Sequence, residues 1–192
     1  MKQIGTIVRV QIQQNPLKDK NGSSRIYDPA PLTVVQAVRV TSTGLVGITI
    51  EGVELLDVHN ESHPRSRYRG DNSISIGFTR HYDQMREYFG RPLADGIAGE
   101  SLIVETDEAH LAEELNDLII ESGQTGEQIR LGGVRAIQPC AEFSQYAAGR
   151  NLHEGDLKDA LQFLLNGRRG FYAQAQATGG TIHTGDRVYL AE

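Results

Sequence analysis

The sequence contains few residues of the kinds that build covalent or metal-based scaffolds. Among 192 residues there is one cysteine, Cys140, and no tryptophan. A single thiol excludes an internal disulfide framework and a cysteine-rich metal site. No apolar run reaches the roughly 18 residues that a membrane-spanning helix requires, so no membrane span is expected. Residues 1–10 lack the apolar block and cleavage site of a secretory signal peptide, and we predict a cytoplasmic protein with a reduced thiol.

Several common catalytic motifs are also missing. The sequence has no GxxxxGK[ST] phosphate-binding loop, no convincing GxGxxG dinucleotide-binding turn, no HExxH zinc helix, no CxxC pair and no GxSxG nucleophile elbow. These absences argue against the commonest hydrolase, kinase and dehydrogenase functions. The formal net charge is -6, and an acidic surface repels phosphate backbones, so general binding of nucleic acid is not expected. A local basic cluster can still bind one small anion.

The chain has 21 glycines, many of them at turns between short β-branched runs, which predicts an all-β or barrel-like body with a few helices. Ile4, Thr6, Val8, Val10 and Ile12 alternate with mostly polar neighbours and predict one half-buried strand. The proline-rich segment 13–31 predicts an irregular excursion or lid. No linker divides the chain, so we expect one domain over 1–192. Further strands are expected at 32–41, at 45–58 as two strands separated by Gly52, at 72–78, and in a C-terminal hairpin over 169–192.

Apolar residues recur at helical spacing in three segments. The first covers 79–90, and the second covers 111–119, where the end of the segment (117–122) fits a strand equally well. The third carries the clearest leucine stripe. The predicted boundaries are Thr79 as N-cap and Gly90 as stop for the first helix, and Asp156 at the start and Gly167 just past the end of the third.

Cys140, which lies outside the three segments of helical spacing, is the strongest candidate for a reactive or metal-ligating residue. The thiolate is the reactive and metal-ligating form of cysteine, and a nearby cation stabilises it. Arg135 need not point to the same side as Cys140, so Arg168 and Arg169 are the better candidate neighbours if the fold brings them close. The alternative is a small buried hydrophobic residue. The preceding proline, Pro139, and the polar residues that follow favour a positioned group at the end of a strand.

Three further segments hold candidate binding residues, each with a structural alternative. Residues 96–102 (GIAGESL) place Glu100 and Ser101 after two glycines, which allow a close approach to an anion or simply form a tight turn. Residues 166–172 place two arginines at a helix end, where they bind an anion or favour the helix C-terminus. The loop 57–71 is either receptive to anions or merely solvated, and Pro64 argues against a two-histidine metal site there. Its candidates are His59, Arg67 and Arg69.

Taken together and in order, five motifs resemble the MOSC domain family, which is related to the C-terminal part of molybdenum cofactor sulfurases. They span most of the chain, and their order and spacing are more specific than any one of them. The sequence departs from the family pattern in three places. Asp57 and His59 supply or only imitate an Asp-His pair after an insertion, Ser101 replaces an asparagine, and the segment between 102 and 139 is longer and more helical than expected. The motifs are GLVG at 44–47, GIAGESL at 96–102, IQPC at 137–140, GRRGFY at 167–172 and GGTIHTGDRVYL at 179–190.

The resemblance implies a mainly β fold, a mostly antiparallel β-barrel with a few peripheral α-helices. It also implies that Cys140 matches the family cysteine, which carries sulfur as a persulfide or ligates the molybdenum of a pterin cofactor. Both roles require an accessible thiolate at a mouth lined by cations. The residues then expected to bind a cofactor are Arg168, Arg169, Arg69, Arg67, His59, Glu100 and Ser101.

Three functions follow as hypotheses. The first is a sulfur carrier in which Cys140 accepts sulfur from a cysteine desulfurase and delivers it for metal-sulfur or molybdenum cofactor chemistry, with pyridoxal phosphate (PLP) only on the partner enzyme. The second is a molybdopterin-binding reductase module for N-hydroxylated compounds, which requires an electron-donor protein. The third is a non-catalytic barrel that binds an anion or a partner protein. The first is favoured at this stage, and no oligomeric state is predicted.

Overall fold

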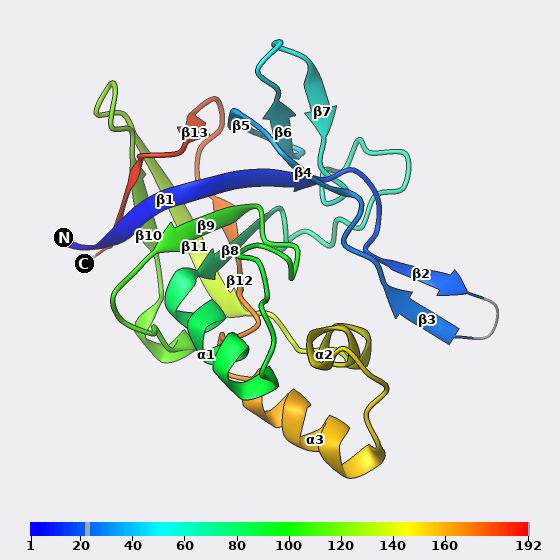
Figure 1. Ribbon diagram of the computed structural model, residues 1–192. Coiled ribbons are helices and arrows are strands. Elements are labelled where there is room, and N and C mark those ends of the chain that lie inside the picture. Colours follow the sequence, from blue (N-terminus) through cyan, green and yellow to red (C-terminus); the bar gives the residue numbers. More distant parts are fainter. Residues whose placement is uncertain (22–23, 192) are drawn as a thin grey trace.

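The computed structural model describes residues 1–21 and 24–191 and shows a β-barrel with helices gathered along one side (Figure 1). Within this part of the chain the barrel closes through pairing of β14 with β1, and β4 (Leu32–Val34) extends it beyond β1. Among the strands that the structure describes, all pairs are antiparallel except the parallel pair of β8 and β9. The prediction of a mainly β, mostly antiparallel barrel is confirmed. The barrel order is β14 (Arg187–Leu190), β10 (Leu118–Glu121), β11 (Gln128–Ala136), β12 (Phe171–Ala175), β8 (Ile74–Phe78), β9 (Leu102–Glu105) and β1 (Lys2–Gln13).

A second, smaller sheet packs against the barrel and shares its hydrophobic core. Leu45 and Ile182 from this sheet lie in the same buried cluster as Ile12 of β1 and Phe171 of β12. The sheet therefore covers one part of the barrel wall and removes it from water. Its strands are β13 (Thr181–His183), β5 (Ala37–Thr41), β6 (Gly44–Ile48) and β7 (Glu54–Leu56).

Strand β1 departs from the simple alternation expected from its sequence. Ile4, Ile7 and Val10 are buried, whereas Val8 is 42% exposed. The pairing register of β1 shifts twice, once against β14 and once against β9. Each such irregularity moves the following side chains to the opposite face, which explains why a strict period of two fails in the middle of this strand.

Two N-terminal predictions need correction. Segment 13–31 is not an irregular loop, because it contains the hairpin of β2 (Lys18–Asn21) and β3 (Ser24–Tyr27). Its prolines flank the hairpin and leave the paired backbone free to form hydrogen bonds. Segment 32–41 is interrupted between β4 and β5, which pair with different strands.

Two further predictions were wrong in the C-terminal half. Segment 111–119 forms a short 3-10 turn, η1 (Ala112–Glu114), followed by strand β10, so the strand alternative for its end is confirmed. The apolar spacing there came from residues in two different elements that face the same core. Segment 169–192 is not a hairpin, because β12 pairs with β11 and β8, β13 with β5, and β14 with β10 and β1.

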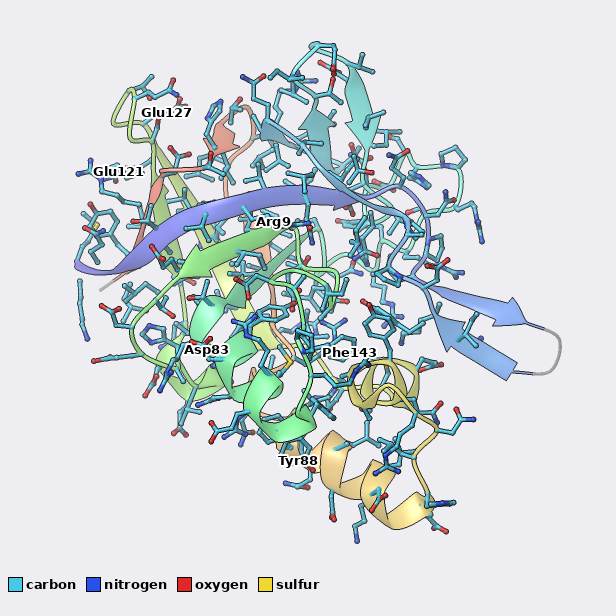
Figure 2. All side chains as sticks on the ribbon, viewed as in Figure 1. Arg9, Asp83, Tyr88, Glu121, Glu127 and Phe143 are labelled. Carbon is cyan, nitrogen blue, oxygen red and sulfur yellow. The ribbon has the colours of Figure 1, made fainter. Side chains whose placement is uncertain are left out.

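The described residues form three α-helices, α1 (Thr79–Phe89), α2 (Ala141–Ala148) and α3 (Glu154–Phe163), and these lie on one side of the barrel (Figure 1). The first and third were predicted, although Phe78 and not Thr79 occupies the N-cap of α1 and α3 starts two residues before Asp156. Helix α2 was missed. Figure 2 shows Phe143 on the side of α2 that faces the barrel, and it packs with Met85 and Leu164 in a second core cluster. No helix in the described residues is long and apolar enough to cross a membrane.

Candidate functional site

A cavity of about 510 Å³ opens between the barrel end, helix α2 and the β2–β3 hairpin. Figure 1 shows the hairpin projecting beside α2 at this end of the barrel. Five separate parts of the chain line the cavity, so only the tertiary fold brings them together. The lining residues are Gln13, Pro16, Leu17, Lys18, Arg25, Tyr27, Val58, His59, Arg67, Arg69, Asn72, Ser75, Ala98, Gly99, Arg135, Ile137, Gln138, Cys140, Arg169 and Tyr172.

Cys140 lies in the cavity wall at the N-cap position of α2. Its backbone is extended, and its carbonyl oxygen accepts hydrogen bonds from the backbone N–H and the hydroxyl of Ser144 at 3.1 and 3.0 Å. The side chain makes no capping hydrogen bond and is half-buried. The backbone of Cys140 is therefore fixed by the helix start, while its thiol remains available to the cavity.

Arg169 lines the same cavity and lies just before the start of β12. Its guanidinium donates to Glu100 Oε1 at 3.4 Å and to the carbonyl oxygen of Ala98. The other carboxylate oxygen of Glu100 accepts from the Tyr82 hydroxyl at 2.6 Å. The guanidinium carbon also lies 4.7 Å from the centre of the Phe143 ring, within cation–π range. These contacts fix a positive charge at the inner wall.

The buried environment shifts the pKa values of this network. Burial raises the pKa of Glu100, against the opposing effects of Arg169 and the Tyr82 hydrogen bond. Burial alone would lower the pKa of Arg169, but Glu100 together with Tyr27, Tyr82 and Cys140 outweighs this effect, and the pKa is raised. Cys140 contributes to that rise, which places its sulfur within electrostatic reach of the guanidinium. Arg169 Nε is buried and has no hydrogen-bond partner in the described part of the chain.

His59 reaches the cavity from the loop after β7 and is held by Asp57. The Asp57 carboxylate is buried and accepts hydrogen bonds from the backbone N–H of Gln13 at 2.8 Å and of His59 at 2.7 Å. His59 Nδ1 lies 3.0 Å from the same Asp57 Oδ1 atom. The Asp-His pair that the sequence left uncertain is thus formed in space. His59 is thereby held at its Nδ1 atom while its side chain lines the cavity.

Arg67 and Arg69 lie on a loop whose backbone is tied down by Asn72. The buried amide of Asn72 accepts from Arg69 N–H at 2.8 Å and donates to the Arg67 carbonyl at 3.0 Å. Neither arginine forms an ion pair with any side chain that the structure describes. The loop therefore presents two cations that have no counter-charge among the described side chains.

Three sequence candidates do not line the cavity. Arg168 turns away, because its guanidinium donates to Gln84 and to the Phe163 carbonyl and lies over the Phe163 ring. Glu100 lies behind the wall, where it holds Arg169. Ser101 is buried in reciprocal hydrogen bonds with Ser75 between β8 and β9.

Several cavity residues escaped the sequence interpretation. Lys18, Arg25 and Tyr27 belong to the hairpin that was taken for a loop. Tyr27 donates to the carbonyl of Ile97 at 2.7 Å and packs 5.2 Å from Phe143, so the hairpin is anchored to α2. Arg135 was considered from the sequence but ranked below Arg168 and Arg169 as a neighbour of Cys140. It lines the cavity beside Tyr172 and pairs with Asp71 at 2.7 Å. A register shift in β11 between Gly132 and Arg135 redirects this side chain, and no pattern in the sequence signals it.

Metal-ligating residues are sparse in this site. The described residues contain no group of three or more histidine, cysteine or acidic side chains that could hold a metal ion.

Comparisons with known proteins identify a matching domain family and solved structures of similar fold. The family model of the MOSC domain matches residues 56–189. The YuaD protein from Bacillus subtilis superimposes with a TM-score of 0.51 at 13% identity, covering 97% of this chain and 93% of that one. YiiM from Geobacillus stearothermophilus superimposes with a TM-score of 0.51 at 17% identity, covering 100% of this chain and 75% of that one. A hypothetical protein superimposes with a TM-score of 0.53 at 16% identity, covering 99% of this chain and 69% of that one. No curated protein matched the chain. The structural likenesses concern the fold, and the domain match shows that the chain belongs to the MOSC domain family.

Proposed function

We propose that the cavity binds a molybdenum–pterin cofactor, with Cys140 as the protein ligand of the metal, and that the protein acts as a reductase module for N-hydroxylated compounds. The observation that carries the proposal is the cationic lining of the cavity around one half-buried thiol. Among the described residues six lysine and arginine side chains line it: Lys18, Arg25, Arg67, Arg69, Arg135 and Arg169.

The size of the cavity favours a multi-atom ligand. Small-molecule and cofactor sites in proteins occupy roughly 300–1,000 Å³. The cavity here, at about 510 Å³, falls in this range. A persulfide on Cys140 adds only one sulfur atom, which needs a small part of this space. The geometry therefore favours cofactor binding over the sulfur-carrier function that the sequence favoured.

The charges of the site fit an anionic cofactor. Arg67 and Arg69 have no described acidic partner, and a guanidinium binds a phosphate group through two parallel hydrogen bonds. Arg169 Nε is buried without a partner among the described residues, and an anionic atom placed beside it would satisfy this donor. Cys140 would provide one sulfur ligand, and the remaining ligands would come from the cofactor. When bound, that group would supply the redox centre.

Within this proposal the residues in and behind the cavity wall have distinct roles. Arg67 and Arg69 would bind the phosphate, and Glu100 and Tyr82 would hold Arg169 beside Cys140. An electron-donor protein would supply electrons, because a chain with one cysteine has no ferredoxin-type cluster of its own. The cytoplasmic location and the single domain over 1–192 stay predictions from the sequence.

The test is the molybdenum and pterin content of protein purified from a molybdenum-replete host. We expect about one of each per chain, and a loss of molybdenum of at least about tenfold in Cys140→Ser. The double variant Arg67→Gln with Arg69→Gln should lose pterin as well, whereas Arg168→Gln, outside the cavity, should keep both. Wild-type protein free of both components would contradict the proposal.

Sulfur transfer remains the second candidate, favoured by the uncapped, half-buried thiol of Cys140. A cysteine desulfurase would be the partner, and PLP would reside on that enzyme. Incubation with the desulfurase and free cysteine should then add about 32 Da, one sulfur atom, to the intact mass. The adduct should be absent in Cys140→Ala. Mass unchanged in the wild type would rule out this function.

A further inference from the structure

His59 is the one imidazole among the side chains that line the described cavity, and its geometry gives it a specific state. A carboxylate only accepts hydrogen bonds, so the contact of 3.0 Å between Asp57 and His59 Nδ1 requires that Nδ1 carry the hydrogen. In the neutral ring Nε2 then holds a lone pair. No hydrogen bond of Nε2 occurs within the described residues.

The side chains of Asp57 and His59 are both held in place by neighbouring groups. Asp57 is 3% exposed, and two backbone N–H groups, from Gln13 and His59, fix its carboxylate. The imidazole ring is further confined by Tyr172 of β12, with ring centres 6.1 Å apart. A histidine oriented by a buried carboxylate in this way exchanges a proton at its other nitrogen without moving.

The charges around the ring couple its protonation to ligand binding. Cations that line the same cavity repel a positive charge on His59, whereas an anion in the cavity attracts one. Protonation also converts Nε2 into a donor that can bind an oxyanion. Asp57 contacts the His59 ring directly. The other titratable and charged groups around it line the same cavity: Arg67 and Arg69 on its own loop, Arg135 of β11, Arg169 and Tyr172 at the start of β12, Lys18, Arg25 and Tyr27 of the hairpin, and Cys140.

We infer that His59, positioned by Asp57, takes up one proton from solvent at Nε2 when an oxyanion enters the cavity, and that the protonated Nε2 donates a hydrogen bond to this anion. No electrons or other bonds change in this step. The inference rests on the proposed function only in requiring that the cavity bind anions. It adds a protonated hydrogen-bond donor beside an oxygen atom in the site, which is the position from which a proton would be supplied when oxygen is removed from an N-hydroxylated compound.

The experiment is calorimetric titration with sulfate, which carries no proton in the pH range where histidine titrates, between about pH 5 and about pH 8. Measurements in two buffers of different ionisation enthalpy give the number of protons taken up. We expect uptake of up to one proton per sulfate and affinity that falls by up to about tenfold for each pH unit as the pH rises through the histidine range. Both effects should vanish in His59→Gln.

His63→Gln is the matched control, because His63 lies on the same loop, bonds to the Gln14 carbonyl and does not line the cavity. It should leave proton uptake unchanged. Nitrogen NMR of the free protein should show the hydrogen on Nδ1 of His59. Sulfate binding without proton uptake, uptake that persists in His59→Gln, or a hydrogen on Nε2 of the neutral ring would overturn the inference alone. No sulfate binding at any pH would overturn both it and the anionic site of the proposed function.

Discussion

The Arg169 guanidinium, which lines the same cavity as Cys140, lies 3.4 Å from the carboxylate of Glu100, which is buried behind the cavity wall. Removing one partner of a buried pair leaves an uncompensated charge, which is more costly than the pair itself is stabilising. The pair therefore links the stability of the barrel to the charge of the cavity.

We predict that Glu100→Gln lowers the free energy of unfolding by about 3 kcal/mol, because Arg169 loses its counter-charge in a buried site. Urea unfolding measures the change. Glu54→Gln is the matched control, since Glu54 pairs with Arg39 at 2.7 Å on the surface, where water replaces the lost contact. Equal effects in the two variants would show that burial does not strengthen the Glu100 pair.

A second prediction concerns Gly167, which has a φ of 96° and lies against the buried ring of Phe171. A Cβ atom there would lie 2.0 Å from Phe171 Cζ. Gly167→Ala should therefore destabilise the protein by about 3 kcal/mol, from backbone strain together with overpacking. Gly52 also has a positive φ, 78°, but a Cβ atom on this residue would have no neighbour within 4 Å. Gly52→Ala should cost only the strain, about 1 kcal/mol, and a comparison of thermal unfolding that shows no difference would refute the steric explanation.

The third prediction is a pH dependence caused by His81. Burial, followed by the nearby charges of Arg168 and His110, lowers the pKa of His81 from 6.5 to about 4. Between these values the unfolded chain binds a proton that the folded chain does not, so stability rises with pH through this window and falls on acidification.

This contribution, about 3 kcal/mol between pH 6.5 and pH 4, should disappear in His81→Leu. Urea unfolding at the two ends of the window measures it as a difference between variant and wild type. His153→Gln is the control, because His153 is exposed and should leave the acid sensitivity unchanged. Identical pH profiles for His81→Leu and the wild type would contradict the assignment.

The fourth prediction concerns access to Cys140. Because its thiol is half-buried in the cavity wall and makes no capping hydrogen bond, a small thiol reagent should modify it in the folded protein. Sulfate should slow the reaction several-fold relative to chloride at equal ionic strength, since the anion and the reagent would occupy the same cavity. Protein unfolded in urea serves as the control and should react at one rate in both salts. A folded protein that resists modification would contradict both chemical functions of this residue.

The sequence by itself determined the class of fold and the elements whose stabilisation is local. Helix α1 was predictable because its apolar face has the right period and Gly90 ends it in a left-handed conformation, at φ 63°. The strands β6 to β8 were predictable because short apolar runs lie between glycine or polar turns. The order of weak motifs indicated the family, and Cys140 stood out because no other residue could supply a thiol.

Only the tertiary structure decided which cations accompany that thiol. Arg168 and Arg169 are neighbours in sequence, yet Arg169 turns into the cavity and Arg168 packs on Phe163. Arg135 enters the site through a register shift, which depends on hydrogen bonds to another strand. Local sequence does not encode such choices, because the energies that select one direction over another come from residues distant along the chain.

The hairpin of β2 and β3 likewise combines local pairing with contacts that only the tertiary structure provides. Its strands pair with each other, but Tyr27 is fixed by Ile97 and by Phe143 on α2, far along the chain. The prolines of 13–31 favoured a loop in the sequence interpretation. A two-stranded hairpin is only marginally stable alone, so this one depends on packing against another element. The sequence thus determined that the protein has a barrel and one thiol. The long-range packing of side chains decided that this thiol shares a cavity with Arg67, Arg69, Arg169 and His59.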